Sequence, residues 1–339
     1  MPAKPTICIY GAGSIGCYIG ARLAASGAEV HLIGRARIAD EVAASGLHAT
    51  DYLGAAFDIA PGAVAFSTDA RQLGHADLVL VTVKSAATAA AAADIARHVP
   101  PGVVVISFQN GIGNDVLLRE SLPHHRVIAG MVQFNVVHRG EGRFHQGSEG
   151  GLEVSRDPSL SPFLNAFARA GLPLAQRADF AAVQWAKLLL NLNNAVNALS
   201  GIPLKAQLAQ RAYRRCTALA QEEGLRVLAA ARLRPARLTI VPPAWIPRVL
   251  RLPDALFSRV AARMLAIDPL ARSSMQDDLV AGRPTEVDWL NGEIVRLASP
   301  RGVSARVNQR LVELIHAAEC GGRRDWSGDA LLAELSGGG

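Results

Sequence analysis

The sequence predicts an α/β domain followed by an all-helical domain. Three observations support this fold class: a strand, glycine turn and helix near the N-terminus; further short apolar strands in the first half; and long helical segments from about residue 180. At 339 residues the chain is too long for one ordinary core and suits two. Because 50% of the residues are hydrophobic and only 19% are charged, both domains can bury a sizeable core.

The N-terminal segment has the pattern of a dinucleotide-binding turn. A short apolar strand is predicted at Thr6–Tyr10, and an Ala- and Leu-rich helix at Cys17–Ser26. Between them lies a run with the spacing G-x-G-x-x-G: Gly11, Ala12, Gly13, Ser14, Ile15 and Gly16. In a Rossmann-type domain these glycines permit the tight turn, the approach of a pyrophosphate and the close packing of the helix, respectively. The pattern alone is also compatible with a plain turn, but the flanking strand and helix favour dinucleotide binding.

The end of the second strand indicates which dinucleotide is bound. This strand, Glu29–Ile33, leads to Gly34 and Arg35, where an NAD enzyme would place a carboxylate for the ribose 2′-hydroxyl. A guanidinium instead suits a 2′-phosphate, which it can bind with two N–H donors. The alternative is a solvated surface arginine. Such residues are common here, because 31 of the 35 lysines and arginines of this chain are arginines. We therefore expect NADP(H) as the cofactor.

Two further strands are predicted in the first domain, at 76–84 and 102–107. Ligands of open α/β sheets bind beyond the carboxyl ends of strands, so we expect Lys84 and the polar segment that contains Asn110 to face the ligands. A simple turn is the alternative at Asn110-Gly111. Apolar segments at 127–137 and 151–154 suggest that the sheet continues, with antiparallel pairing among the added strands.

The second half of the chain is dominated by helical patterns. We expect helices at 181–199, 205–233, 256–265, 274–280, 286–298 and 308–318, with a proline-rich connection at 232–253. The expected domains are therefore a nucleotide-binding domain at 1–178 and a helical substrate domain at 179–320. We expect the glycine-rich segment 321–339 to be a flexible tail.

Lys187 is the most informative residue of the helical half. The other lysines are Lys4, Lys84 and Lys205, so the chain uses arginine at most basic positions. A desolvated ammonium can lose its proton and a guanidinium cannot, so a proton donor must stay lysine. At 100° per residue, Asn191 lies 40° to one side of Lys187 and Asn194 lies 20° to the other. This gives a polar stripe on an otherwise apolar helix. It indicates either a catalytic site or a set of polar contacts between helices.

Composition excludes several classes of function. The net charge of +6 is spread along the chain without a basic, aromatic-rich tract, which argues against nucleic-acid binding. The four cysteines have no metal-ligand or redox spacing, so we expect reduced thiols, no metal site and a cytoplasmic location. No apolar run is long enough to span a membrane without charge or proline.

Taken together, these motifs resemble the ketopantoate reductases (2-dehydropantoate 2-reductases), which reduce 2-dehydropantoate with NADPH on the way to pantothenate and coenzyme A. The resemblance covers the chain to about residue 319, and its later motifs are Trp185-Ala186-Lys187-Leu188, Ser273–Asp277 and Thr285–Gly292. It implies a fold like that of 6-phosphogluconate dehydrogenase, with Lys187 as the general acid and Glu286 as an acidic partner near the lysine and the cofactor. The other implied roles are cofactor and substrate binding by Asn110, substrate binding by Asn191 and Ser274, and binding of the NADP phosphate end by Arg35 and Lys84.

One position departs from the family pattern. A second substrate asparagine is often found eight residues after the lysine, where this chain has Ala195. Asn194 and Asn197 are both candidates to replace it, the first by helical phase and the second by the residues that follow it. The alternatives are a reductase of another small 2-keto acid, a β-hydroxyacid or phosphogluconate-type dehydrogenase, and a non-catalytic NADP-binding sensor. A homodimer is compatible with this interpretation, and the sequence does not fix the oligomeric state.

Overall fold

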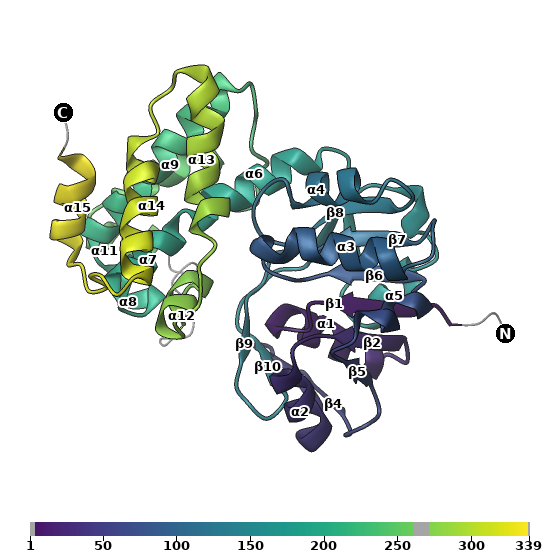
Figure 1. The fold of residues 1–339 in the computed structure, drawn as a ribbon. Helices are drawn as coiled ribbons and strands as arrows, with labels where there is room; N and C mark the ends of the chain where they lie inside the picture. Colours follow the sequence, from purple (N-terminus) through teal and green to yellow (C-terminus); the bar gives the residue numbers. More distant parts are fainter. Residues whose placement is uncertain (1–3, 261–270, 338–339) are drawn as a thin grey trace. The chain divides into compact units, whose positions relative to one another are not determined.

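The computed structural model describes residues 4–260 and 271–337. It divides into two compact units, Met1–Phe180 and Ala181–Gly339 (Figure 1). The first is an α/β unit and the second is built from helices, which is the fold class that the sequence predicts. The division falls two residues after the domain boundary expected at residue 178, at the start of a helix.

An eight-stranded sheet forms the centre of the first unit, in the order β12-β11-β8-β7-β6-β1-β2-β5. The six strands from β5 to β8 in this order are parallel, β11 pairs antiparallel with β8, and β12 pairs parallel with β11. The strand order reverses between β1 and β6, a position at which open α/β sheets bind ligands. The bounds are β1 Thr6–Tyr10, β2 Glu29–Ile33, β5 Ala65–Ser67, β6 Leu78–Val81, β7 Val104–Ser107, β8 Arg126–Val132, β11 Leu152–Ser155 and β12 Leu174–Arg177.

Helices cover both faces of this sheet (Figure 1). Side chains of β1 alternate between two cores: Ile7 and Ile9 pack with α1 and α5, whereas Cys8 packs with α3 and α4. The helix bounds are α1 Ser14–Ala25, α2 Ala36–Ser45, α3 Thr88–His98, α4 Asn114–Ser121 and α5 Leu164–Arg169, with 3-10 turns η1 Ala70–His75, η2 Ser85–Ala87 and η3 Pro158–Leu160. Burial on both faces explains why these strands read as continuous apolar runs in the sequence.

A second sheet of four strands, in the order β4-β3-β10-β9, packs on α1. Its bounds are β3 Leu47–Asp51, β4 Ala56–Ile59, β9 Val136–His138 and β10 Arg143–Gln146. Residues 136 and 137, which we expected to extend the main sheet, lie in β9 instead. The chain leaves β8 at residue 132 and its next strand pairs with β10, so the expectation was wrong for these two residues.

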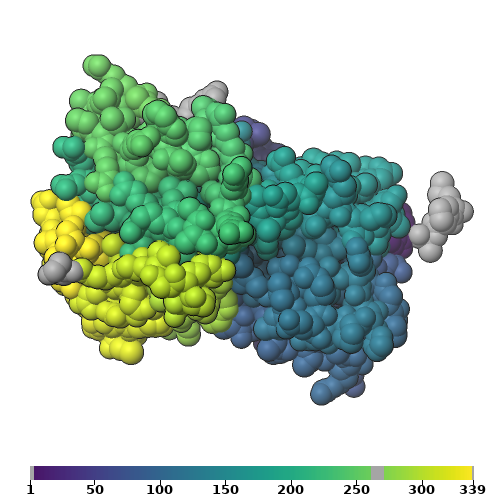
Figure 2. Space-filling view, turned by 90° about the horizontal axis from the view of Figure 1, so that it is seen from above, coloured from purple at the N-terminus to yellow at the C-terminus, as the bar shows by residue number. Residues whose placement is uncertain are grey.

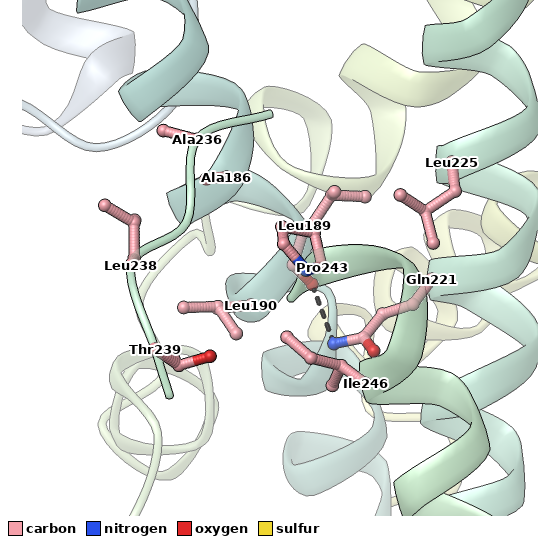
Figure 3. A pocket seen from close by; sticks show the side chains of 10 residues that line it. All are labelled: Ala186, Leu189, Leu190, Gln221, Leu225, Ala236, Leu238, Thr239, Pro243 and Ile246. Carbon is pink, nitrogen blue, oxygen red and sulfur yellow. Dashed lines mark hydrogen bonds between the residues drawn. The ribbon is translucent and has the colours of Figure 1, made fainter. Parts of the chain in front are cut away.

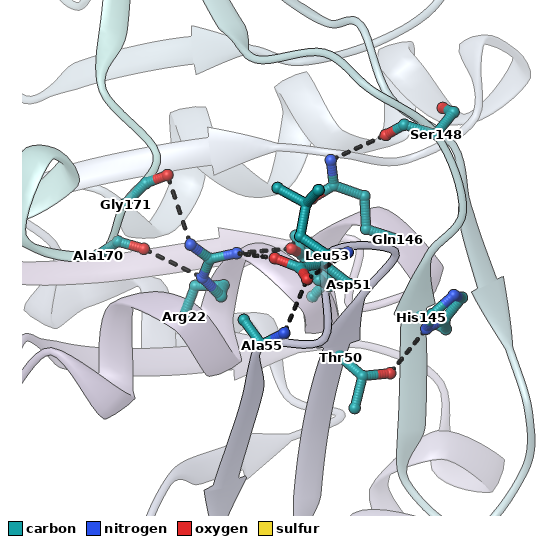
Figure 4. Close-up of polar contacts among 11 residues, drawn as sticks. Arg22, Thr50, Asp51, Leu53, Ala55, His145, Gln146, Ser148, Ala170 and Gly171 are labelled. Atoms are coloured by element: carbon teal, nitrogen blue, oxygen red, sulfur yellow. Dashed lines mark hydrogen bonds and ion pairs between the residues drawn. The ribbon is translucent and has the colours of Figure 1, made fainter.

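A buried arginine joins this second sheet to α1 (Figure 4). Arg22 donates hydrogen bonds to the Tyr18 hydroxyl (2.7 Å) and to the backbone oxygen of Ala170 (3.0 Å), and its guanidinium lies 3.8 Å from the Asp51 carboxylate. The Tyr18 hydroxyl in turn donates to Gln146 Oε1 at 2.6 Å. Since α1 follows the glycine turn, these contacts also fix the helix on which the candidate cofactor site is built.

The second unit is built mainly from helices. Their bounds are α6 Phe180–Asn191, α7 Asn193–Ser200, α8 Leu204–Ala209, α9 Arg211–Ala230, α10 Ile246–Leu250, α11 Asp254–Val260, α12 Ser274–Val280, α13 Asn291–Ala298, α14 Arg306–Glu319 and α15 Gly328–Ser336, with 3-10 turns η4 Pro243–Trp245, η5 Val287–Trp289 and η6 Ser299–Arg301. The proline-rich connection at 232–253 contains η4 and α10.

Three of the expected long helices are interrupted. The segment 181–199 is divided at Leu192, although the Leu192 N–H still donates to the Leu188 oxygen at 3.1 Å. The segment 205–233 is divided at Gln210, whose backbone is extended, and 286–298 begins as η5 before α13. Of the expected helix 256–265, residues 256–260 lie in α11 and residues 261–265 lie outside the described residues. Neither the apolar Leu192 nor the polar Gln210 disturbs the apolar periodicity, so the pattern does not reveal these breaks.

Residues 328–336 form helix α15, which corrects the expectation of a flexible tail for this part of the segment 321–339. Helix α15 packs against α9, and Leu331, Leu332 and Leu335 are buried. Ser327 caps it by accepting a hydrogen bond from the Ala330 N–H at 3.3 Å. In Figure 2 its yellow atoms form part of the surface of the helical unit. The glycines at 321, 322 and 328 interrupt the pattern, but the three leucines supply the apolar surface that holds this helix in place.

Candidate active site

The glycine turn has the geometry that phosphate binding requires. Gly11 has a φ of +104°, and a Cβ there would lie 2.6 Å from the Val83 nitrogen. A Cβ on Gly16 would lie 2.7 Å from both the Gly11 oxygen and Thr82 Oγ1. Gly13 precedes α1, whose first turn has no side-chain cap and no acidic residue. The free N–H groups of this helix N-terminus can therefore receive a pyrophosphate.

Arg35 lies at the N-terminus of α2, directly after β2, and is exposed. Its guanidinium has no hydrogen-bond or ion-pair partner among residues 4–260 and 271–337. The nearby Arg37 differs, because it is bound to Glu41 (2.7 Å), which also accepts from His138 (2.7 Å). Of these two arginines, Arg35 is therefore the one whose charge is available to an anionic ligand.

A buried hydrogen-bond network joins the loops after β6 and β7. Ser85 Oγ donates to the Asn110 backbone oxygen (3.0 Å), which also accepts from Asn114 Nδ2 (2.7 Å). The Thr88 hydroxyl lies 2.8 Å from Asn114 Oδ1 and accepts from Gln109 Nε2 at 2.7 Å. The network fixes the backbone at Asn110. The side chains of Asn110 and of Lys84, which precedes Ser85, are exposed.

Sequence reasoning did not identify this network. Its members are buried polar residues immediately after two apolar strands, and that position was an available signal. Ser85, Thr88 and Asn114 are buried, so their role is to hold the two loops in place.

Lys187 lies on α6, in a half-buried stripe that continues through Asn191 and Asn194. Burial lowers the pKa of Lys187 to about 8. At neutral pH the ammonium form therefore remains the major one, yet it gives up its proton far more readily than an ordinary lysine. Neither the Asn191 nor the Asn194 side-chain amide has a hydrogen-bond partner among the described residues. The stripe thus combines a proton donor with two available amides.

The Asn197 side chain is already hydrogen-bonded within the protein, so the prediction that it binds substrate was wrong. Its side chain is fully buried, and Nδ2 donates to the Ile202 oxygen (3.1 Å) while Oδ1 accepts from the Ser273 N–H (2.9 Å). Both ends of the amide are therefore used within the protein, and no ligand can reach them. Ala195 is also fully buried.

Ser274 is brought to this region by its neighbour Ser273. The Ser273 hydroxyl caps α12 by accepting from the Gln276 N–H (3.2 Å) and donates to the Asn194 backbone oxygen (3.3 Å). Ser274, the first residue of α12, is exposed beside this junction with α7. Glu286 is half-buried and immediately precedes η5, and the Thr285 N–H before it donates to Glu319 Oε1 at 2.7 Å.

A small apolar cavity lies on another face of α6 (Figure 3). It is lined mainly by leucines and alanines of α6, α9 and the segment 236–246, and it has room for about one water molecule. Gln221 Nε2 donates to the Leu189 oxygen at 3.1 Å, whereas its Oε1 has no hydrogen-bond partner among the described residues. Neither Lys187 nor the two available asparagines line this cavity, so it is not the candidate substrate site.

Two negative findings apply to the described residues. No group of three or more His, Cys, Asp or Glu side chains within 4–260 and 271–337 is arranged to hold a metal ion. In the same part of the chain, no helix has the length and apolar character needed to cross a membrane.

Comparisons with known proteins agree with the observed architecture. Residues 7–158 match the family model for ketopantoate reductase PanE/ApbA, and residues 179–319 match the model for its C-terminal domain. The 2-dehydropantoate 2-reductase of Halobacterium salinarum is 28% identical over 320 residues, which is 92% of this chain and 98% of that protein. The corresponding enzyme of Caulobacter vibrioides is 28% identical over 259 residues, 74% of this chain and 81% of that protein.

Solved structures show the same fold. The PanE/ApbA family ketopantoate reductase from Ralstonia eutropha JMP134 has a TM-score of 0.80 and 29% identity, covering 93% of this chain and 99% of that one. A D-mandelate dehydrogenase with NADH and anilino(oxo)acetate has a TM-score of 0.76, with the same coverage of both chains. At 21% identity, this second likeness concerns the fold alone.

Proposed function

Because the chain belongs to the ketopantoate reductase family of oxidoreductases, we propose that it reduces 2-dehydropantoate to pantoate with NADPH. The observation that carries this proposal is Lys187, whose pKa is lowered to about 8 by burial and whose helix stripe carries two available amides. A keto-acid reductase needs a proton donor beside hydrogen-bonding groups for the substrate. The 2-dehydropantoate 2-reductases at 28% identity support the choice of substrate.

The residues of the first unit fit a nicotinamide dinucleotide. The glycine turn and the uncapped N-terminus of α1 would receive the pyrophosphate. Arg35 would bind the 2′-phosphate, with Lys84 as a second cation, and Asn110 would contact both cofactor and substrate. The bound cofactor supplies the hydride. All remaining steps belong to the side chains of the protein.

Lys187 would hold the transferred proton at Nζ. As the keto carbon gains the hydride, its oxygen takes that proton, so that a keto acid becomes a 2-hydroxy acid and the lysine becomes neutral until solvent protonates it again. Such a donor typically contributes about 10² to 10⁴ in rate. Asn191, Asn194 and Ser274 would orient the substrate through its hydroxyl and carboxylate, and Glu286 would act as the acidic partner of the lysine.

Cofactor preference is tested with the Arg35→Asp variant. We expect NADPH to be preferred by the wild type, and the variant to lose or reverse that preference because a carboxylate repels the 2′-phosphate. Titration calorimetry with both cofactors measures this, and Arg37→Ala is the matched control because Glu41 already binds Arg37. Equal affinity of the wild type for NADH and NADPH would refute the assignment.

Substrate choice is tested by comparing 2-dehydropantoate with the same keto acid lacking the terminal hydroxyl. A site built to bind a hydroxyl rejects the analogue without it by up to about 10⁴-fold, because its polar groups are left unpaired. We expect strong discrimination in kcat/KM, weakened in Asn191→Ala and Asn194→Ala.

A second candidate function is the reduction of a different small 2-keto acid. The position of the family's second asparagine holds the buried Ala195, and Asn197 is committed to contacts within the protein. Only Asn194 remains to supply the missing amide. Faster turnover of an apolar 2-keto acid than of 2-dehydropantoate would favour this second function.

A further inference from the structure

The chain on both sides of Glu286 is anchored to the end of α14, by a backbone N–H before it and by a side chain after it. On one side, the Thr285 N–H donates to Glu319 Oε1 at 2.7 Å. On the other, Asp288 Oδ1 lies 3.1 Å from His316 Nε2. His316 Nδ1 also lies 3.0 Å from Glu319 Oε2, so the two contacts are linked through His316 and Glu319. We call these four residues, Thr285, Asp288, His316 and Glu319, the His316 clamp.

The clamp requires a protonated imidazole. Both ring nitrogens of His316 face carboxylate oxygens, and a neutral imidazole has only one N–H. Burial by itself would lower the pKa of His316, but the hydrogen bonds to Glu319 and Asp288 outweigh it and raise that pKa. Burial would likewise raise the pKa of Glu319, yet its hydrogen bonds to Thr285 and His316 lower it.

The charges around the clamp favour the cationic ring. Asp288, Glu319 and Glu286 itself are carboxylates on the segments that carry or adjoin the clamp. On the neighbouring helix α13, Arg296 is paired with Glu293 (3.0 Å), so its charge is balanced. On α14, Glu313 is likewise paired with Arg310 (2.8 Å). His316 is therefore the cation that balances the two clamp carboxylates.

We propose that His316 is a positioning residue, which holds the Glu286 turn in its working geometry only while the imidazole is protonated. The effect on turnover rests on the role proposed above for Glu286, whereas the clamp itself does not. When the ring loses a proton, one nitrogen turns its lone pair toward a carboxylate, and the contact of His316 with either Asp288 or Glu319 is lost. The stabilising contribution is complete below the ordinary histidine pKa of about 6.5 and is lost as pH rises through the raised value.

The test compares two substitutions of the full-length protein. His316→Gln keeps donors but has no charge, whereas His316→Arg keeps a permanent charge with several donors. His48→Gln is the matched control, since His48 also pairs with a carboxylate (Asp58, 2.6 Å) but lies in the first unit. The readouts are the NMR titration of the His316 ring and the pH profile of kcat and KM for NADPH-dependent reduction of 2-dehydropantoate.

We expect the wild-type His316 ring to titrate above the ordinary value, and to shift down in Glu319→Gln. His316→Gln should lower kcat about tenfold at neutral pH, in line with the cost of small misplacements near reacting groups. His316→Arg should keep activity at pH values where the wild type loses it, and a purely structural role would not produce this rescue.

Two results would overturn the proposal: a ring that titrates at or below its ordinary value, or a pH profile of His316→Gln that superimposes on that of the wild type. The NMR titration needs no turnover. If Glu286→Gln were fully active while the titration matched expectation, the role of Glu286 in the proposed function would be wrong and the clamp would stand.

Discussion

Reduction should decline above about pH 8, because the proposed proton donor is Lys187 and burial lowers its pKa to about 8. The perturbation is a change of pH alone, so the fold and the side chains stay constant. The lysine must be protonated to act as an acid, and the reduction rate should follow its ammonium fraction. In the opposite direction, oxidation of the hydroxy acid requires a neutral lysine and should increase over the same range.

The size of the decline in reduction rate follows from the pKa of Lys187. With a pKa of about 8, roughly nine-tenths of Lys187 is protonated at pH 7 and roughly one-tenth at pH 9. The pH-dependent factor in kcat/KM should therefore fall about tenfold between these values. An ordinary lysine, with a pKa of about 10.4, would give almost no change there. The comparison thus separates a desolvated lysine from a solvated one.

The assay follows NADPH oxidation at saturating cofactor, with substrate varied at each pH. His316 contributes its own pH dependence, so the measurement is repeated in His316→Arg, in which that group no longer titrates. Lys187→Arg should abolish most of the turnover, since a guanidinium keeps the charge but does not give up its proton. Lys205→Arg is the matched control, because Lys205 is an exposed lysine of the same unit. A flat reduction profile to pH 9, or a Lys187→Arg variant with near-normal turnover, would refute the reasoning.

Two further predictions concern stability and cofactor binding. Arg214→Met should lower the free energy of unfolding in urea by about 3–5 kcal/mol, because the Leu250, Leu208 and Leu252 oxygens lose their buried donor. Asp254, the ion-pair partner at 2.9 Å, is 63% exposed and stays solvated. A loss below about 1 kcal/mol would contradict the prediction. Gly16→Ala should weaken NADPH binding in titration calorimetry at least about tenfold, because its methyl group would lie 2.7 Å from the Gly11 oxygen and from Thr82 Oγ1. Unchanged affinity would show that the turn adapts to the methyl group.

The first half of the fold was largely predictable from local sequence. The strands at 6–10 and 29–33 have the predicted bounds. The first is buried along almost its whole length and leaves a continuous apolar signal, whereas the second includes the exposed Glu29 and the half-buried His31. The glycine turn was predictable for a related reason. The close approach of Val83 and Thr82 leaves no room for a side chain, and the requirement for glycine appears directly as spacing.

Other parts of the fold depend on partners that are distant in the sequence. The second sheet pairs β3 with β10, whose residues lie about ninety positions further along the chain, and neither strand has a strong pattern alone. The C-terminal helix α15 is held by its contact with α9, whereas its glycine-rich flanks suggested disorder. In both cases the apolar surface that stabilises the element belongs to another segment.

The candidate site shows the same limit at the level of single side chains. Helical phase relates Lys187 to Asn191 and Asn194, which the structure places on α6 and α7, but it cannot say which asparagines are already hydrogen-bonded. Asn197 is occupied because Ser273, 76 residues further along the chain, donates to it. The Ser273 hydroxyl also binds the Asn194 backbone oxygen, and the Asn194 side-chain amide has no hydrogen-bond partner among the described residues. A protein that replaced Ser273 by alanine would keep the backbone N–H bound to the Asn197 oxygen. It would lose the hydroxyl that caps α12 and binds the Asn194 backbone oxygen, and so would loosen the junction of α7 and α12. Which of these side-chain amides is already hydrogen-bonded thus depends on a residue at the start of another helix.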